Sequence, residues 1–167
     1  KGYTASGPRG LSNNGGSHGG MGHGNTYATY GSITNPTTKG PGARTAGGGL
    51  IILNVSGILN VSGSINSNGS SAGSYYSGAG GSVNIHAGSL VGNGAIAADG
   101  GEKAGISGGG GGRVAVILGD SGSNFTSYVG TISAYGSAGY GSNTGAAGTV
   151  YLKGGDADYG ELIIDNM

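Results

Sequence analysis

Few side chains in this sequence could do chemistry, and the acidic ones gather near its end. The acidic cluster consists of Asp156, Asp158, Glu161 and Asp165. Ca²⁺ takes several oxygen ligands, and the loop that carries Asp156 and Asp158 could supply two of them. Neither the EF-hand spacing nor the nonapeptide calcium repeat accompanies the pair. We therefore expect a solvated turn and no cofactor, with Asp156 and Asp158 as the candidates for any Ca²⁺ site.

The histidines make a second candidate for metal binding. His18 and His23 lie five residues apart in a glycine-rich stretch, and His86 stands alone on an expected outward strand position. A zinc site takes three or four nitrogen, sulfur or carboxylate ligands, and no cysteine or nearby carboxylate completes this pair. We therefore expect exposed loop histidines that form hydrogen bonds, and no metal.

Catalytic constellations are equally sparse. A polysaccharide-cleaving β-helix needs two carboxylates at a fixed separation on one face. The mid-chain carboxylates are Asp99 with Glu102, and Asp120, which fall in loops of different expected coils. The run Gly108 to Gly112 before Arg113 is not a phosphate loop, because a strand-like segment follows it instead of Lys-Ser/Thr and a helix. We expect no catalytic residue and no enzymatic activity.

Four Asn-x-Ser/Thr motifs are candidate N-glycosylation sites, provided that the source organism has the machinery. They begin at Asn54, Asn60, Asn68 and Asn124. Asn54 and Asn60 have the parity of outward-facing strand residues, and a fibre with few charges needs solubilising groups. The alternative is that these asparagines form a hydrogen-bonded ladder on the outside of stacked coils.

The aromatic side chains are almost all tyrosine. The chain has ten tyrosines and no tryptophan, and several tyrosines precede glycine, as in Tyr30-Gly31 and Tyr135-Gly136. A tyrosine ring can cover a neighbouring glycine backbone, or it can offer a stacking surface to a sugar ring. We favour packing, because tyrosine commonly buries its ring and keeps its hydroxyl hydrogen-bonded.

Composition excludes several classes of protein. The 167 residues include 44 glycines, no cysteine and only 8% charged residues, with seven basic and seven acidic. Nucleic-acid binding needs a basic stripe, and a polybasic membrane anchor needs a cluster of Lys and Arg, and neither is present. No stretch approaches the about 18 apolar residues of a membrane span. Low charge also leaves strand edges open to pairing with neighbours.

The elements that would position these residues repeat along the chain. A glycine, any residue and an apolar β-former recur five times, beginning at Gly31, Gly63, Gly94, Gly130 and Gly160. Spacings of 30 to 36 residues indicate a repeat architecture. Between Gly49 and Gly69, apolar residues alternate with Asn and Ser, which predicts strands with one buried face. Glycines recur there every six residues, where short strands would bend.

We predict an all-β parallel β-helix, or β-solenoid, with coils of roughly 30–36 residues. Residues 1–47 form a glycine-rich region that contributes a partial coil, and the repeats cover about 48–80, 81–111, 112–147 and 148–167. The Gly- and Ser-rich loops between coils should pack as a second layer. The apolar residues of the repeated triplet should stack as one interior column: Ile33, Ile65, Ile96, Ile132 and Leu162.

Four segments together resemble a known group of proteins. They are the GGSHGG loop from Gly15, the YGSITNP turn from Tyr30, the GGGLIILNVSG segment from Gly47, and the glycine run that leads into Arg113. This succession resembles glycine-rich modules of very large microbial surface and secreted proteins. More distantly it is similar to adhesin-type β-helices such as filamentous haemagglutinin. The resemblance implies an extracellular or cell-surface location and a structural or adhesive role, and it carries over no catalytic residue.

Assembly is the function that the sequence favours. Neither terminus reads as a polar cap, and the last residues stay strand-like, so Leu162, Ile163 and Ile164 are the expected assembly end. The expected partners are other copies of the chain or neighbouring repeats of a longer one, and glycans or surfaces. One alternative is a carbohydrate-binding or polysaccharide-degrading β-helix with tyrosines and carboxylates in one groove. Another is an ice-binding solenoid, for which the threonines are too scattered.

Overall fold

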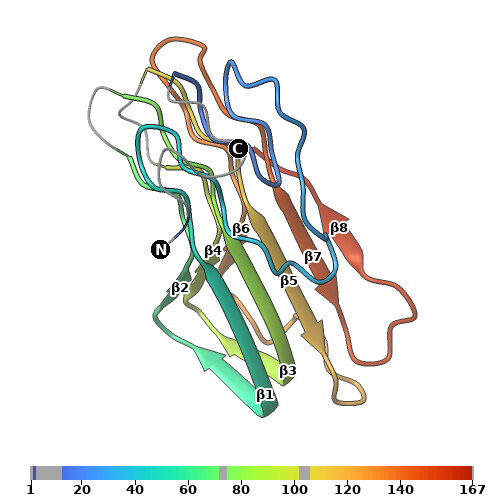
Figure 1. The fold of residues 1–167 in the computed structure, drawn as a ribbon. Helices are drawn as coiled ribbons and strands as arrows, with labels where there is room; N and C mark the ends of the chain where they lie inside the picture. Colours follow the sequence, from blue (N-terminus) through green and yellow to red (C-terminus); the bar gives the residue numbers. More distant parts are fainter. Residues whose placement is uncertain (1, 3–12, 72–74, 102–105, 167) are drawn as a thin grey trace.

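The chain folds as a β-solenoid of about three turns. The computed structural model describes residues 2, 13–71, 75–101 and 106–166, and these contain eight strands and no helix. Strands that lie roughly 32 residues apart in the sequence stack in parallel (Figure 1). The predicted all-β, parallel solenoid is confirmed.

Each turn contributes to two sheets. The larger sheet has the strand order β1-β3-β5-β7-β8, and the smaller has the order β2-β4-β6. The strands of the larger sheet are β1 (Leu50–Val61), β3 (Ser82–Gly92), β5 (Arg113–Leu118), β7 (Thr149–Lys153) and β8 (Glu161–Ile163). Those of the smaller are β2 (Ser64–Asn66), β4 (Ala95–Ala97) and β6 (Thr131–Ser133).

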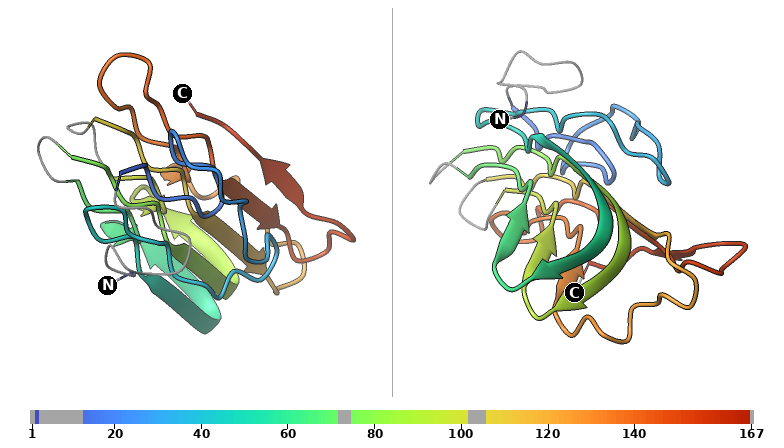
Figure 2. Two further views of the ribbon diagram at one scale, coloured as in Figure 1. Left: turned by 45° about the horizontal axis from the view of Figure 1, so that its top comes forward. Right: turned by 90° about the horizontal axis from the view of Figure 1, so that it is seen from below.

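The register reproduces the spacing of the sequence repeat. Leu50 stands opposite Ser82, Ser82 opposite Arg113, and Arg113 opposite Thr149. Between Val55 and Ile58 the pairing of β1 with β3 shifts at an irregularity of the bulge type. A bulge bends the strand that carries it. Figure 2 (right) shows β1 and β3 as nested curves that turn toward the smaller sheet.

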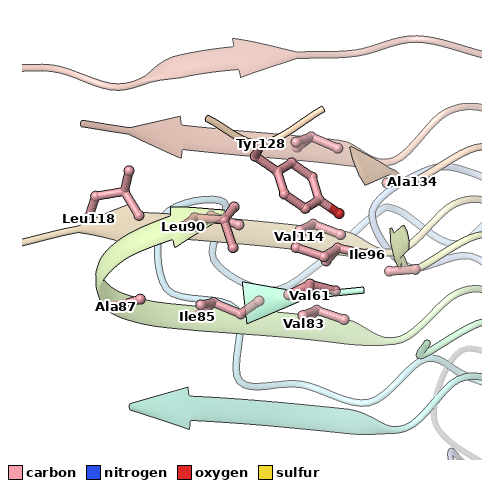
Figure 3. Packing of buried hydrophobic residues seen from close by; sticks show 13 residues of the cluster. Val61, Val83, Ile85, Ala87, Leu90, Ile96, Val114, Leu118, Tyr128 and Ala134 are labelled. Atoms are coloured by element: carbon pink, nitrogen blue, oxygen red, sulfur yellow. The ribbon is translucent and has the colours of Figure 1, made fainter. Parts of the chain in front are cut away.

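Alternate residues of the strands fill the space between the two sheets. In β1 the side chains of Ile51, Leu53 and Val55 are partly buried, whereas Asn54 and Ser56 are exposed. The deepest residues come from the second and third turns. Figure 3 shows Val83, Ile85, Leu90, Ile96 and Val114 pointing toward one another, and Val116 is equally buried. The period-two pattern therefore predicted the buried face.

Three of the five residues expected in one interior column do stack. Ile65 pairs with Ile96, and Ile96 pairs with Ile132, in the smaller sheet. Ile33 does not join them, because it lies in an irregular segment before the first turn. Leu162 does not join them either, because it lies in β8 opposite Tyr151.

The position of Leu162 follows from the direction of β8. This strand pairs antiparallel with β7, so residues after β7 form a hairpin instead of a fourth turn. A parallel strand would require a crossover of about a dozen residues or more around the solenoid. The seven residues between Lys153 and Glu161 are too few for that path within the larger sheet. They are more than the two that connect β1 to β2 and β3 to β4, so the length of the connection alone does not keep β8 from a place beside β6.

The glycine-rich stretches form the expected second layer, which is built from extended backbone. Gly80 N–H donates to the carbonyl of Gly110 (3.0 Å), and Gly110 N–H donates to that of Gly16 (2.9 Å). Gly111 N–H donates to the carbonyl of Ala146 (3.0 Å), and the carbonyl of Gly111 accepts from Gly20 N–H (2.8 Å). A Cβ atom on Gly110 would collide with the backbone of the neighbouring segment. Glycine is needed because the backbones approach so closely.

The segment 30–38 crosses the outer face of the larger sheet. It is the blue segment that passes in front of the strands in Figure 1. The hydroxyl of Ser82 donates to Thr38 O (2.6 Å), and the amide of Asn84 donates to Asn35 Oδ1 (2.7 Å). The N-terminal region therefore covers the first half of the strands and leaves the bend uncovered, instead of adding a strand to the described sheets.

Candidate functional sites: an outer groove and an open coil end

A groove of about 530 Å³ lies on the outer face of the larger sheet, where the strands bend. Three successive turns line it: Asn54 and Ser56 belong to β1, His86 belongs to β3, and Asp120 follows β5. The strand register places Asn54 opposite His86, and His86 opposite Ile117. Residues far apart in the sequence therefore form one row across the solenoid.

Stacking of the turns holds Asp120 in place. Its backbone N–H donates to the carbonyl of Gly88 (3.0 Å), and its own carbonyl accepts from Ser123 N–H (3.1 Å). The carboxylate lies close over Gly88: a Cβ atom added to that residue would be only 2.6 Å from Asp120 Oδ2. Gly88 thus leaves the space that this carboxylate occupies at the bend.

The polar side chains of the groove have no partner among the residues that the structure describes. Within the described part of the chain, the side chains of Asn54, Ser56, His86 and Asp120 form no hydrogen bond and no ion pair. All four residues are exposed. Their donors and acceptors are therefore available to a ligand or to water.

On the covered half of the same face, His18 is fully buried. Its Nδ1 lies 2.8 Å from Gly80 O, and its Nε2 lies 2.8 Å from Thr38 Oγ1. A carbonyl can only accept, so Nδ1 carries the proton and Nε2 accepts from the Thr38 hydroxyl. Burial lowers the pKa of His18 to about 4, and the nearby Arg113 charge acts in the same direction. The expectation of an exposed loop histidine is wrong for His18.

Arg113 is a second buried group of this half that carries a titratable side chain. Its Nε donates to Tyr30 O (2.8 Å), and its Nη1 donates to Thr149 Oγ1 (3.0 Å). Burial lowers the pKa of Arg113, and the nearby Tyr30 opposes this shift. The side chain fastens the N-terminal segment to the third and fourth strands of the larger sheet. The sequence around Arg113, a glycine run before a strand, suggests only a phosphate loop and gives no sign of this role.

The remaining acidic candidates hold turns and loops together. Asp156 Oδ2 accepts from Gly122 N–H (2.6 Å) and from the Ser121 hydroxyl (3.3 Å), and Asp158 is exposed. Across the described ranges, no group of three or more His, Cys, Asp or Glu side chains could hold a metal ion. The loop of Asp156 thus bridges two turns.

Asp99 connects the second and third turns. Its carboxylate accepts from Tyr135 N–H (2.7 Å) and from the Ser133 hydroxyl (3.0 Å). Burial raises the pKa of Asp99, and the two hydrogen bonds oppose this shift. Glu102, its candidate partner, lies outside the described residues.

The four glycosylation candidates differ in accessibility. Asn54 and Asn60 are exposed on β1, and Asn124 is exposed in the loop after β5, where its Oδ1 accepts from the Thr126 N–H (3.0 Å). Asn68 is half-buried, and its Oδ1 accepts from Asp99 N–H (2.7 Å). The alternative of an asparagine ladder is wrong for β1, because Asn54 faces His86 and Asn60 faces Val91.

The first turn forms an open end of the solenoid. Val61 is buried, but five other inward side chains of this turn are only partly buried, in contrast to those of the second turn; they are Ile51, Leu53, Val55, Leu59 and Ile65. β1 pairs only with β3, so its other edge is unpaired within the described sheets. No charged residue occurs from Leu50 to Asn66.

The backbone of β1 shows which groups face the free edge. Ser82 N–H donates to Gly49 O (3.0 Å). Bonding residues alternate along a parallel strand pair, so the peptide groups of Leu50, Ile52 and Asn54 point away from β3. These groups form a row that a further strand could use.

The opposite end of the larger sheet is different. β8 is three residues long, and Glu161 and Asp165 carry charges at and just after it. Leu162, Ile163 and Ile164 are exposed, with 65% of the Ile164 side chain accessible. This end therefore offers a shorter strand edge than β1, together with exposed apolar side chains. The two ends of the molecule are therefore unequal.

No family model, curated protein or solved structure matches this chain. Within residues 2, 13–71, 75–101 and 106–166, no helix has the length and apolar character needed to cross a membrane. A fold can host many functions, so the functional argument rests on the groove and the open end.

Proposed function

We propose that this protein is an extracellular structural or adhesive β-solenoid that associates with other copies of itself or with neighbouring repeats of a longer chain. The single observation that carries this proposal is the open first turn. Its partly buried core residues and unpaired strand edge lie at the same end of the molecule. The resemblance of the sequence to modules of microbial surface proteins supports the location.

Addition of a strand next to β1 would satisfy both features at once. The new strand would use the peptide groups of Leu50, Ile52 and Asn54, and its side chains would cover the exposed parts of Ile51 and Leu53. The absence of charge between Leu50 and Asn66 removes the usual protection of an edge strand. Together these features favour association over isolation.

The unequal ends favour growth in one direction. Head-to-tail contacts between unlike surfaces produce open chains when the geometry does not close. In such a chain the open first turn would meet the end that carries Leu162, Ile163 and Ile164 of the next copy. That arrangement gives a filament, whereas pairing of two β1 edges would stop at a dimer.

The alternatives receive less support. Asp120 is the single carboxylate among the groove-lining residues, whereas glycoside cleavage uses two. The outward row contains Asn54, His86 and Ile117 instead of threonines, which does not suit an ice-binding ladder. We therefore propose a structural or adhesive role and not a catalytic one.

Light scattering and electron microscopy of the purified chain test this proposal. We expect the mass to rise with concentration and fibres to form. In the variant Ile52→Lys/Ile58→Lys, two exposed β1 side chains become charged, and association should fall at least about tenfold. Val129→Lys places the charge at another highly exposed position and should associate like the wild type. A monomer at all concentrations, or equal association of both variants, would contradict the proposal.

A further inference from the structure

The outer groove at the bend lies complete within one copy of the chain. It combines a carboxylate, an amide, an imidazole and a hydroxyl from three turns with the partly buried side chain of Ile117. We infer that this groove binds a saccharide, with Asp120, His86 and Asn54 as its polar contacts. The inference does not depend on self-association.

The donor and acceptor set suits neighbouring hydroxyl groups. A carboxylate accepts two hydrogen bonds, an amide both donates and accepts, and a neutral imidazole does the same through its two nitrogens. The groove therefore offers both donors and acceptors to the hydroxyl groups of a sugar, from Asp120, Asn54 and His86. Because their side chains have no described protein partner, a ligand would displace only water.

The arrangement of the row favours an oligomer over a single ring. Asn54, His86 and Ile117 occupy successive strands, which stack at about 4.8 Å in a parallel sheet. A chain of sugar rings could follow this row across the turns. The groove volume of about 530 Å³ lies within the range of small-molecule sites, roughly 300–1,000 Å³.

Asp120 is already positioned for such a contact. The bond from its backbone to Gly88 O fixes it on the second turn, and the missing Cβ of Gly88 leaves room for the carboxylate. A ligand would therefore meet a carboxylate that needs little ordering. The carboxylate also disfavours anionic ligands such as phosphates and sulfated sugars.

The groove fits a saccharide better than a metal ion. His86 and Asp120 are the only lining residues with side chains of the His, Cys, Asp and Glu types, fewer than a protein metal site uses. Ile117 instead offers apolar surface to the C–H face of a sugar ring. Of the described lining residues none is aromatic, so we expect weak affinity, with a Kd on the order of 1 mM.

The test is an NMR titration of the ¹⁵N-labelled full chain with neutral oligosaccharides, namely cellotetraose, maltotetraose, mannotetraose and tetra-N-acetylchitotetraose, in EDTA. We expect at least one to shift the amide signals of Ser56, His86, Gly88 and Asp120. Asp120→Asn should weaken that binding about fivefold or more. Asp158→Asn, which changes an exposed carboxylate outside the groove, should leave it unchanged.

Two further measurements keep the inference falsifiable. Dispersed amide signals in Asp120→Asn would show that the variant folds, and Asn54→Ala tests the groove separately if it does not. No shift with any of the four oligosaccharides, or shifts confined to another surface, would overturn the inference. The inference would also be overturned if Ca²⁺ or Zn²⁺, added without EDTA, shifted the same amide signals while no sugar did.

Discussion

The outer face of the larger sheet has two halves that use similar polar residues in different ways. Where the segment 30–38 covers the strands, Asn84 and Arg113 are buried and hydrogen-bonded. At the bend, His86 and Asp120 are exposed and lack described partners. Polar residues of this face are therefore structural in one half and available in the other, depending on whether another segment covers them.

The largest difference in stability is expected between two glycines. In Gly111→Ala the new Cβ would collide with the backbone of Ala134 and Gly148, next to the glycine-rich second layer. We therefore expect the free energy of unfolding to fall by at least about 4 kcal/mol, or the chain not to fold. Gly57 lies at the bend, and a Cβ there meets no atom within 4 Å. Gly57→Ala should change stability by less than about 1 kcal/mol. Urea unfolding of both variants measures the difference.

The next prediction concerns pH and His18. Because the folded state lowers the pKa of His18 from 6.5 to about 4, the unfolded chain binds the proton more tightly. This contribution to stability is complete above pH 6.5. It is lost as the pH falls, and at about pH 4 the loss reaches about 3 kcal/mol. Tyr30, Thr38, Gly80 and Arg113 surround the ring and offer no negative charge to stabilise a protonated imidazole.

Urea unfolding between pH 4 and pH 8 checks this prediction. His18→Gln should show a flatter pH dependence in the acid range than the wild type. Asn54→Ala, at the uncovered bend, removes no titratable group and should keep the wild-type slope. Parallel curves for the wild type and His18→Gln would mean that His18 is not held neutral by the fold.

A smaller effect is expected at Arg113. Arg113→Met keeps much of the apolar stem but removes the bonds to Tyr30 O and Thr149 Oγ1, which should cost about 2 kcal/mol. It should also expose the segment 30–38 to proteolysis. His86→Ala should cost less than about 0.5 kcal/mol, because its side chain has no described partner. Equal losses in the two variants would erase the distinction between the halves.

The sequence could predict the features that depend on local pattern. Alternation in β1 indicated the buried face, and the recurring glycines at Gly63, Gly94 and Gly130 matched the register of the smaller sheet. It could not predict the antiparallel β8, because Leu162 follows the same triplet pattern as the parallel strands. The direction of β8 is set by its pairing with β7, which the triplet does not encode.

The contacts in the covered half of the outer face could not be predicted from local sequence pattern either. His18 and Arg113 are 95 residues apart in the sequence and belong to one buried cluster, which forms only when the N-terminal segment crosses the sheet. Asp120 was singled out as a carboxylate, but its place beside His86 depends on the stacking of two turns. A glycine-rich composition hides such contacts, since it carries little information about which segments meet.

The most direct test of assembly through the open first turn is amide hydrogen exchange of the wild-type chain as a function of concentration. The peptide groups of Leu50, Ile52 and Asn54 should exchange rapidly in dilute samples and become protected as association proceeds. The amides of Ile51 and Leu53, which face β3, should be protected throughout. If Ile52 and Asn54 remain unprotected in associated samples, strand addition at β1 is not the basis of assembly.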